Sequence, residues 1–311
     1  MQNKKDIRVI INPNAKKFRT GRASFDCYRK LESDMVSIIT PSTLDELHSA
    51  ADLMAKEKPD YICIAGGDGT LHVVLSSIIN SFQPEPVPPV LILKEGTMDN
   101  VARTINLKGR GPQLLQRLIN AVNTGNEIEI HKRTTMKINN MYCFLFGTGF
   151  ITNFLREAYS GKEKGFIRNI QVALMSAKEA LSNSSNGKIF REMFGEVYID
   201  DKKIDINPVH GLLAGTVEHI GMGFSPMPGA AYQEGAFEAI IVGLKPSSII
   251  MKLNRLRTGK IIKSDKYLKC HGKKIRMNYD HSYDYTMDGD IYQAIGELIV
   301  ETGPAVNLVK V

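Results

Sequence analysis

The sequence has no apolar run long enough to cross a membrane. Its longest apolar segments, such as residues 89–93 and 239–243, are far shorter than the roughly 20 residues that a spanning helix requires. The amino end, residues 1–8, is charged and lacks the apolar core of a signal peptide. We therefore expect a cytoplasmic protein whose contact with a membrane is at most peripheral.

Cysteine is scarce, and the motifs of several common enzyme classes are missing. The four cysteines have no CxxC or zinc-like spacing, so we expect reduced thiols in the core: Cys27, Cys63, Cys143 and Cys270. No GxxxxGK(S/T), GxSxG or HExxH sequence occurs, and protein-kinase signatures are absent. These absences argue against P-loop hydrolases, hydrolases with a GxSxG serine, HExxH metalloproteases and protein kinases.

Signals for nucleic-acid binding are also missing. The formal net charge of +7 favours an anionic partner, such as a nucleotide, a nucleic acid or an acidic lipid headgroup. Aromatic residues are not interleaved with the basic runs, and no helix-turn-helix or RNA-binding signature is present. We therefore expect no nucleic-acid partner.

The length and the order of the elements predict two domains. A chain of 311 residues exceeds the usual size of a single core. Up to Gly125, short apolar strands alternate with helical patterns, which is typical of a parallel α/β sheet. The expected strands are 7–11, 36–39, 61–65 and 90–93, and the expected helices are 24–31, 43–56, 71–79 and 113–122.

After Gly125 the pattern changes to strands and turns, which predicts an antiparallel β domain. The expected strands are 127–137, 141–147, 194–199, 211–217, 237–242 and 274–277. Helical insertions are expected at about 151–183 and 247–256. We place the first domain at residues 1–126 and the second at 127–295, and leave open whether residues 296–311 return to the first.

The strongest motif is a glycine-rich turn directly after the strand at 61–65: Gly66, Gly67, Asp68, Gly69 and Thr70. Three glycines let the backbone approach a bulky anion, and the carboxylate among them could hold a metal or accept a proton. The alternative is a tight turn in which Asp68 caps the helix that follows. That alternative leaves the paired glycines unexplained.

Two other strand ends carry similar signals. Gly96, Thr97, Asp99 and Asn100 follow the strand at 90–93 and begin a helix, so they could join the first turn in one crevice. A helix simply capped by Thr97 is the alternative. The first strand ends at Asn12 and Pro13, and the turn after it is rich in positive charge that could neutralise phosphates: Lys16, Lys17, Arg19 and Arg22. A solvated charged face would explain that run equally well.

The second half of the chain contributes acidic turns. Asp288, Gly289 and Asp290 set two carboxylates around a glycine, and Glu234 lies in another acidic turn. Such carboxylates could hold Mg²⁺ or remove a proton from a hydroxyl. An ordinary Asp-Gly hairpin is the alternative. His72 lies on an apolar helix, which favours packing over catalysis.

Together these motifs resemble the diacylglycerol kinase catalytic-domain family. Residues 66–70 match its GGDGT, residues 96–103 resemble its GTxNDxAR block, and Asn12 with Pro13 lies at its NP turn. Later motifs also follow the order and spacing of the family. They are Phe146, Gly147, Gly149 and Phe150, then Gly221, Gly223 and Pro228, then residues 234–238 and 288–290. GGDGT alone also occurs in NAD kinases, so the ordered series carries the specificity.

The resemblance implies an α/β domain and a β-sandwich that enclose a nucleotide cleft, and ATP- and Mg²⁺-dependent phosphorylation of a lipid hydroxyl, diacylglycerol-like or sphingoid-like. It assigns the phosphates to Gly66, Gly67, Gly69 and Thr70, and the nucleotide site also to Asn12, Gly96, Thr97 and Asn100. Asp68 would organise metal or take the proton, Asp290 would be the other candidate base, and Glu234 a metal ligand. An anionic membrane surface is the expected partner, and a homodimer is left open.

Several residues depart from the family pattern. Asn14 to Lys17 replace the usual Ser-Gly after the NP turn, Asp99 and Asn100 stand in inverted order, and Asp290 stands where glutamate is usual. These departures keep open a regulator that binds nucleotide or lipid without catalysis. An NAD kinase is the other alternative, because it shares residues 66–70, although no Asn-Asn-Asp or Asn-Asp-Glu stretch typical of its ribose site occurs. Basic residues Lys162, Lys164 and Arg168 could rest on anionic lipid, or their helix could simply pack on the β domain.

Overall fold

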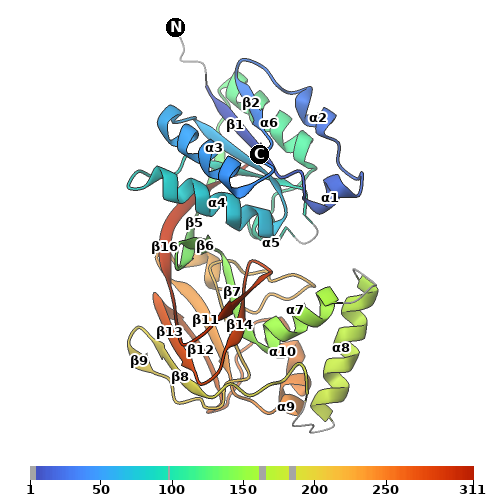
Figure 1. Ribbon diagram of the computed structural model, residues 1–311, viewed down its shortest axis with the longest axis vertical. Helices are drawn as coiled ribbons and strands as arrows, with labels where there is room; N and C mark the ends of the chain where they lie inside the picture. The colour runs from blue at the N-terminus through green and yellow to red at the C-terminus, as the bar shows by residue number, and fades with distance from the viewer. Residues whose placement is uncertain (1–4, 97–98, 161–165, 182–186) are drawn as a thin grey trace. The chain divides into compact units, whose positions relative to one another are not determined.

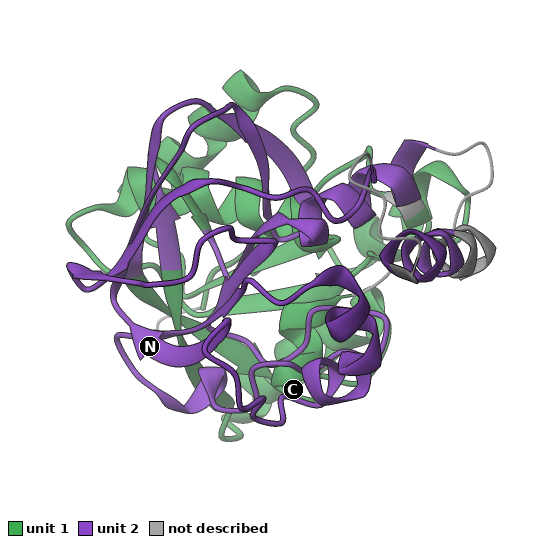
Figure 2. Cartoon of the chain, turned by 90° about the horizontal axis from the view of Figure 1, so that it is seen from below, with its two compact units in different colours: residues 1–135, 140–142, 304–311 green, residues 136–139, 143–303 purple. Residues whose placement is uncertain are grey.

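The computed structural model describes residues 5–96, 99–160, 166–181 and 187–311. The chain forms two compact units, shown in two colours in Figure 2. Unit 1 consists of Met1–Thr135, Asn140–Tyr142 and Pro304–Val311, and unit 2 of Met136–Asn139 and Cys143–Gly303. The change from one unit to the other falls inside two long strands, whereas the sequence placed it in the loop at 126–127. A strand shared by two units has no linker composition, so the sequence carried no signal at that point.

Unit 1 is a parallel α/β unit, as the sequence predicted (Figure 1). Its strands run in the order β2-β1-β3-β4, and the end of β16 joins β4 in parallel through Leu308 and Val90. The strands are β1 (Ile7–Ile11), β2 (Val36–Ile39), β3 (Tyr61–Gly66), β4 (Val90–Lys94) and β16 (Glu297–Lys310). The helices are α1 (Lys16–Arg19), α2 (Phe25–Arg29), α3 (Leu44–Glu57), α4 (Asp68–Phe82), α5 (Asn100–Thr104) and α6 (Gly111–Thr124).

Helix α3 shows how local sequence fixes these elements. The Thr43 side chain accepts a hydrogen bond from the backbone N–H of Glu46 at 3.2 Å, and the Glu46 carboxylate accepts one from the N–H of Ser42 at 2.6 Å. The first bond satisfies a donor that the first turn leaves free, and the second ties the residue before the cap to that turn. The buried face of α3 is spaced for one side of a helix: Leu47, Ala50, Ala51 and Met54. Helix α3 packs against α4 on one face of the sheet.

Unit 2 is built on antiparallel pairing, also as predicted. One sheet has the order β12-β11-β10-β7-β14-β15, and in a second β16 pairs with β13, β13 with β8 and β8 with β9. The first sheet contains β7 (Leu145–Gly149), β10 (Gly211–Gly215), β11 (Phe237–Val242), β12 (Tyr267–Gly272), β14 (Tyr283–Met287) and β15 (Asp290–Ala294). The second contains β8 (Gly195–Ile199), β9 (Lys202–Lys203), β13 (Lys274–Tyr279) and part of β16. Strands β5 (Glu129–Ile138) and β6 (Met141–Cys143) pair with each other.

Two helical insertions interrupt unit 2. The first consists of α7 (Phe150–Ser160) and α8 (Phe166–Leu181), and the second of η1 (Ala230–Tyr232) followed beyond β11 by α9 (Pro246–Met251) and α10 (Leu253–Arg257). The sequence predicted one helix at 247–256. The structure divides it at Lys252, whose ψ of 8° departs from helical geometry.

None of the described helices combines the length and the apolarity that crossing a membrane requires. Cys63 and Cys143 are buried, as expected for core residues. Cys27 was expected in the core as well, but it is exposed on α2. A five-residue helix has too few turns for its buried face to be identified from the sequence.

Candidate functional site

The turns after β3 and β4 lie against each other. Gly66 pairs with Lys94 at the ends of the two strands, and the N–H of Glu95 donates to the carbonyl of Gly66 at 3.0 Å. A Cβ on Gly67 would lie 3.1 Å from the Cα of Gly96, and one on Gly96 would lie only 2.5 Å from the Cα of Gly67. Side chains at these positions would push the turns apart. The glycines are thus required by backbone contact, and the predicted meeting of the two turns is confirmed.

The turn after β1 joins the first glycine turn through Asn12. The Asn12 amide donates to the hydroxyl oxygen of Thr70 at 2.8 Å, and its backbone N–H donates to the carbonyl of Ala65 at 3.1 Å. Gly66 leaves room for that threonine, because a Cβ there would lie 2.3 Å from the Thr70 side chain. Three parallel strands therefore end in one connected group of turns, at the edge of the sheet where such folds bind ligands.

Asp68 begins α4 and does not cap it. The capping position belongs to Gly67, which has no side chain to bond to the first turn, so the alternative with Asp68 as the cap is wrong. The Asp68 carboxylate instead accepts the N–H of Asn100, at 2.9 Å to Oδ1 and 3.2 Å to Oδ2. Burial, and to a smaller degree the charge of Asp99, raises the pKa of Asp68 to about 6. Gly69 follows it in the first turn of α4.

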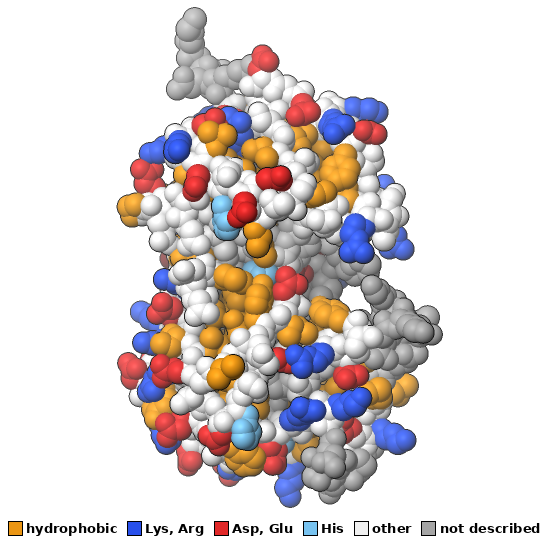
Figure 3. Space-filling view, viewed as in Figure 1, with side chains coloured by type: hydrophobic (Ala, Val, Ile, Leu, Met, Phe, Trp, Pro, Cys, Tyr) orange, Lys and Arg blue, Asp and Glu red, His pale blue; other side chains and the backbone are white. Residues whose placement is uncertain are grey.

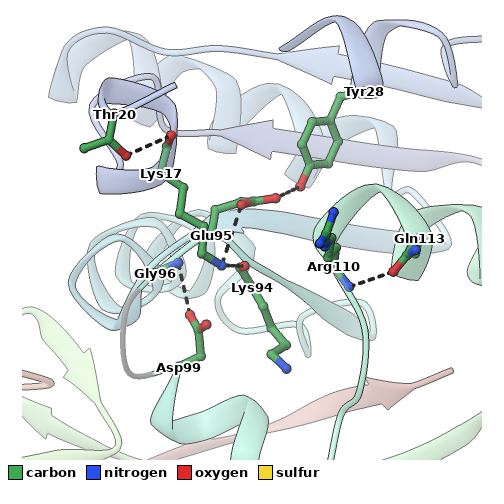
Figure 4. Close-up of polar contacts among 9 residues, drawn as sticks. All are labelled: Lys17, Thr20, Tyr28, Lys94, Glu95, Gly96, Asp99, Arg110 and Gln113. Atoms are coloured by element: carbon green, nitrogen blue, oxygen red, sulfur yellow. Dashed lines mark hydrogen bonds and ion pairs between the residues drawn. The ribbon is translucent and has the colours of Figure 1, made fainter. Parts of the chain in front are cut away.

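The inverted pair at the start of α5 has a structural role. Asp99 adopts a left-handed conformation, with φ of 49° and ψ of 48°, and its Oδ1 accepts the N–H of Gly96 at 3.1 Å (Figure 4). Asn100 is 97% buried and presents its N–H to Asp68. Each residue of the pair thus holds one of the two glycine turns. Thr97, expected to line the nucleotide site, lies outside the described residues.

A buried carboxylate at this edge was not predicted. Glu95 accepts a hydrogen bond from the Tyr28 hydroxyl at 2.5 Å, and Lys17 Nζ lies 3.9 Å from its second oxygen (Figure 4). Lys17 also donates to the carbonyl of Lys94 at 2.5 Å. Burial raises the pKa of Glu95 despite these partners. The position of Glu95 directly before Gly96 was the available signal, but the partners come from residues far away in the sequence.

The basic turn after β1 is only partly directed to this edge. Lys17 is half-buried beside Glu95, whereas Arg19 and Arg22 are exposed. The side chain of Lys16 lies outside the description. Of the basic run, Lys17 is therefore placed beside the glycine turns, and the exposed arginines fit the solvated-face alternative.

His72 is a packing residue, which is the role that the sequence favoured over catalysis. The side chain is fully buried on α4, and burial lowers its pKa to about 4. It is therefore neutral at physiological pH and does not add a charge beside Asp68.

The acidic turn of unit 2 is a hairpin between β14 and β15. Asp288 and Gly289 both have positive φ, 48° and 98°, which is the geometry of a tight two-residue hairpin turn. The buried Asp288 carboxylate accepts the N–H of Phe144 at 3.1 Å and that of Leu145 at 2.8 Å. Asp288 therefore anchors strand β7, and the hairpin alternative is correct for the turn itself.

Asp290 opens β15 with a side chain at the surface. The protein around it still desolvates the carboxylate enough to raise its pKa. Glu234 lies on an exposed turn between η1 and β11. Both residues belong to unit 2, whereas Asp68 belongs to unit 1.

The described residues suit a nucleotide-bound Mg²⁺ better than a metal held by protein alone. Among them, no three His, Cys, Asp or Glu side chains gather as a metal cage. Mg²⁺ commonly uses one or two carboxylates and completes its shell with phosphate oxygens and water. Asp68, in the first turn of a helix whose capping residue Gly67 makes no side-chain hydrogen bond, fits that arrangement.

The fold and this edge define the class: an α/β unit with glycine turns after neighbouring parallel strands, followed by an antiparallel β unit. Residues 6–129 match the family model of the diacylglycerol kinase catalytic domain, the family that the motifs resemble. The resemblance drawn from the motifs is thereby confirmed. No curated protein sequence matches the chain.

Solved structures share the fold over the whole chain. A diacylglycerol kinase from Bacillus anthracis strain Sterne has a TM-score of 0.65 at 14% identity, covering 100% of this chain and 98% of its own. Two proteins of the same strain, provisionally named diacylglycerol kinases, have TM-scores of 0.69 and 0.67 at 13% and 14% identity. Each covers 100% of this chain and 99% of its own. At this identity the likeness establishes the fold.

Proposed function

We propose that the protein transfers the γ-phosphoryl group of ATP to the hydroxyl of a lipid, diacylglycerol-like or sphingoid-like, at a membrane surface. The observation that carries the proposal is the pair of interlocked glycine turns with Asp68 between them. It is supported by the family match over residues 6–129. Phosphoryl transfer requires positioning and charge neutralisation more than covalent help, and both are available at this edge.

Each residue of the edge would have a defined task. The backbone of Gly66, Gly67 and Gly69 would bind phosphate oxygens, helped by the uncapped start of α4. Thr70 is oriented by Asn12 and would present its hydroxyl to the nucleotide. Gly96, Asn100 and Thr97, on the second turn, would line the same site.

Asp68 would be the residue that holds Mg²⁺. Mg²⁺ held there would supply charge neutralisation for the transferred phosphoryl group. Asp68 has a pKa of about 6 without it, so a neighbouring cation would favour the ionised form. The acceptor hydroxyl would lose its proton to Asp290, whose raised pKa improves it as a base, or to Asp68 itself. Glu234 would be a further metal ligand.

The substrate class is tested by offering ATP labelled in the γ-phosphate with three acceptors: diacylglycerol vesicles, sphingoid-base vesicles and NAD. We expect label in a lipid product that is identified by mass spectrometry. Label in NAD alone would show an NAD kinase instead.

Loss of catalysis is the other alternative, because the departures from the family pattern cluster at Asp99, Asn100 and Asp290. It is tested by thermal shift with ATP and Mg²⁺ beside the same assay. Stabilisation by nucleotide without label in any acceptor would support a regulator. The proposal expects stabilisation and turnover together.

A further inference from the structure

The charge of the chain is concentrated in one segment of unit 2. Residues 245–266, which contain α9 and α10, hold seven Lys or Arg residues and one acidic residue, Asp265, a net charge of 7 − 1 = +6. The whole chain has a net charge of +7, so the other 289 residues contribute +1. The basic residues are Lys245, Lys252, Arg255, Arg257, Lys260, Lys263 and Lys266. We call residues 245–266 the basic segment.

This charge faces solvent. Of the seven basic side chains, six are exposed and Lys252 is intermediate. Among the described residues, no ion pair joins any of them to a carboxylate, in contrast to Lys203 with Glu196 or Lys310 with Glu129. Lys and Arg side chains are spread over the face of the molecule drawn in Figure 3, with acidic side chains among them. The segment therefore presents positive charge that the described part of the protein does not neutralise.

Large apolar side chains are exposed within the same segment. Met251 is 82% exposed, Ile261 70% and Leu253 40%. Single exposed apolar residues need no explanation, but three within eleven residues, interleaved with four positive charges, form an amphipathic surface. No aromatic residue lies in residues 245–266, so base stacking has no platform there.

The segment is held firmly by the sheet beneath it. Lys269 of β12 donates to the carbonyl of Gly259 at 3.0 Å and to that of Pro226 at 2.9 Å, and it pairs with the buried Glu238 of β11 at 2.9 Å. The N–H of Ser225 donates to the carbonyl of Arg257 at 2.8 Å. A surface that is already ordered loses little entropy when it binds.

We propose that the basic segment is the surface by which this protein docks on a bilayer of anionic phospholipid. The positive side chains would lie among the headgroups, and Met251, Leu253 and Ile261 would enter the boundary of the acyl chains. Anionic headgroups attract the positive side chains, and burial of the apolar side chains then holds the segment at the membrane. The inference rests on the proposed function for its biological purpose, since a lipid acceptor must be reached in a bilayer. The surface that the sequence suggested stays a separate prediction, because Lys162, Lys164 and the side chain of Arg168 lie outside the described residues.

The test measures binding of the full chain to phosphatidylcholine vesicles with and without phosphatidylglycerol, by co-sedimentation in the absence of nucleotide. The charge variant is Lys260→Gln/Lys263→Gln/Lys266→Gln, whose side chains make none of the described hydrogen bonds. Its matched control is Lys30→Gln/Lys56→Gln/Lys108→Gln, which removes the same charge from exposed positions of unit 1. One membrane-facing lysine contributes about fivefold in affinity, so the charge variant should bind anionic vesicles about a hundredfold more weakly. The control should bind almost as the unmodified chain does.

A second variant tests the apolar contribution. Met251→Ser/Ile261→Ser keeps the charge, and both side chains are exposed, so the fold should be retained. We expect about tenfold weaker binding for each substitution, and the loss should persist at high salt because apolar burial is not screened.

Two outcomes would overturn the inference. Equal loss of binding in the charge variant and its control would show attraction to net charge alone. Competition by duplex DNA, together with no effect of Met251→Ser/Ile261→Ser, would make the segment a nucleic-acid surface. Because no nucleotide is present, vesicle binding by a protein that phosphorylates no lipid would sustain the docking surface and contradict only the proposed function.

Discussion

The two acidic turns of the molecule look alike in sequence but differ in what their carboxylates do. In unit 1, Asp68 lies between glycines that are packed against a second turn, and its carboxylate accepts backbone N–H groups at the start of α5, those of Asn100 and Val101. In unit 2, Asp288 accepts the N–H groups of Phe144 and Leu145 at the start of β7, and Asp290 beside it reaches the surface. Asp288 is buried and its carboxylate serves the fold, whereas Asp68 is only partly buried and keeps acceptor capacity that a ligand could use.

The largest effect that separates these roles is expected in unit 2. Asp288→Ala leaves the buried N–H groups of Phe144 and Leu145 without their acceptor, at about 1–3 kcal/mol each. We expect a loss of about 2–6 kcal/mol in unfolding free energy, measured by urea denaturation. Asp290→Ala is the matched control and should change stability by less than about 0.5 kcal/mol, because its side chain is at the surface. Similar losses of stability in both variants would contradict the different roles assigned to Asp288 and Asp290.

The contact between the glycine turns gives the next effect. Gly96→Ala places a Cβ 2.5 Å from the Cα of Gly67, and such overpacking costs about 1–3 kcal/mol. Gly125→Ala, where a Cβ meets nothing within 4 Å, should cost only the strain of its left-handed backbone, about 1 kcal/mol. Thermal unfolding compares the two. A larger loss at Gly125 would show that the turns do not depend on close contact.

The buried Glu95 provides a smaller effect in the same unit. Tyr28→Phe removes the hydroxyl that donates to Glu95 and should cost about 2 kcal/mol, because a buried carboxylate loses a short hydrogen bond. Combined with Glu95→Gln, the loss should be less than the sum of the single losses, since the two residues interact directly. A double-mutant cycle in urea checks this, and full additivity would contradict the interaction.

The smallest effect concerns pH. The pKa of His72 is lowered to about 4 in the folded chain, against about 6.5 when unfolded, so the unfolded chain binds a proton that the folded chain refuses. Stability is therefore retained above about pH 6.5 and lost as the pH falls toward 4, by about 1 kcal/mol between pH 7 and pH 5.5. His72→Asn should lack this share of the pH dependence in urea titrations. The unmodified chain and His72→Asn should be compared by the slope of the unfolding free energy against pH. The absolute stabilities are not compared, because the contribution of Asp68 is common to both proteins. An unchanged slope would contradict a buried neutral histidine.

Much of unit 1 was predictable, because its elements are local. Strands 7–11 and 36–39 have the bounds that periodicity predicted, and the turns at Gly66 and Gly96 meet because parallel strands end at one edge. The partners of Glu95 and Asp288 could not be predicted, since Tyr28 and Phe144 reach them only through the tertiary fold. The division of the chain within long strands, and Asp99 bonded to Gly96, likewise have no local signal.

The central claim is that Asp68 at the interlocked glycine turns supports phosphoryl transfer to a lipid. The most direct measurement is the rate of label transfer from γ-labelled ATP to the lipid acceptor by Asp68→Asn, compared with the unmodified chain. Asparagine keeps the shape and an acceptor for the N–H of Asn100, so the fold should persist, while the loss of the charge removes a Mg²⁺ ligand. The account predicts a rate about a hundredfold to a thousandfold lower with cooperative unfolding retained. Transfer at the unmodified rate would contradict it.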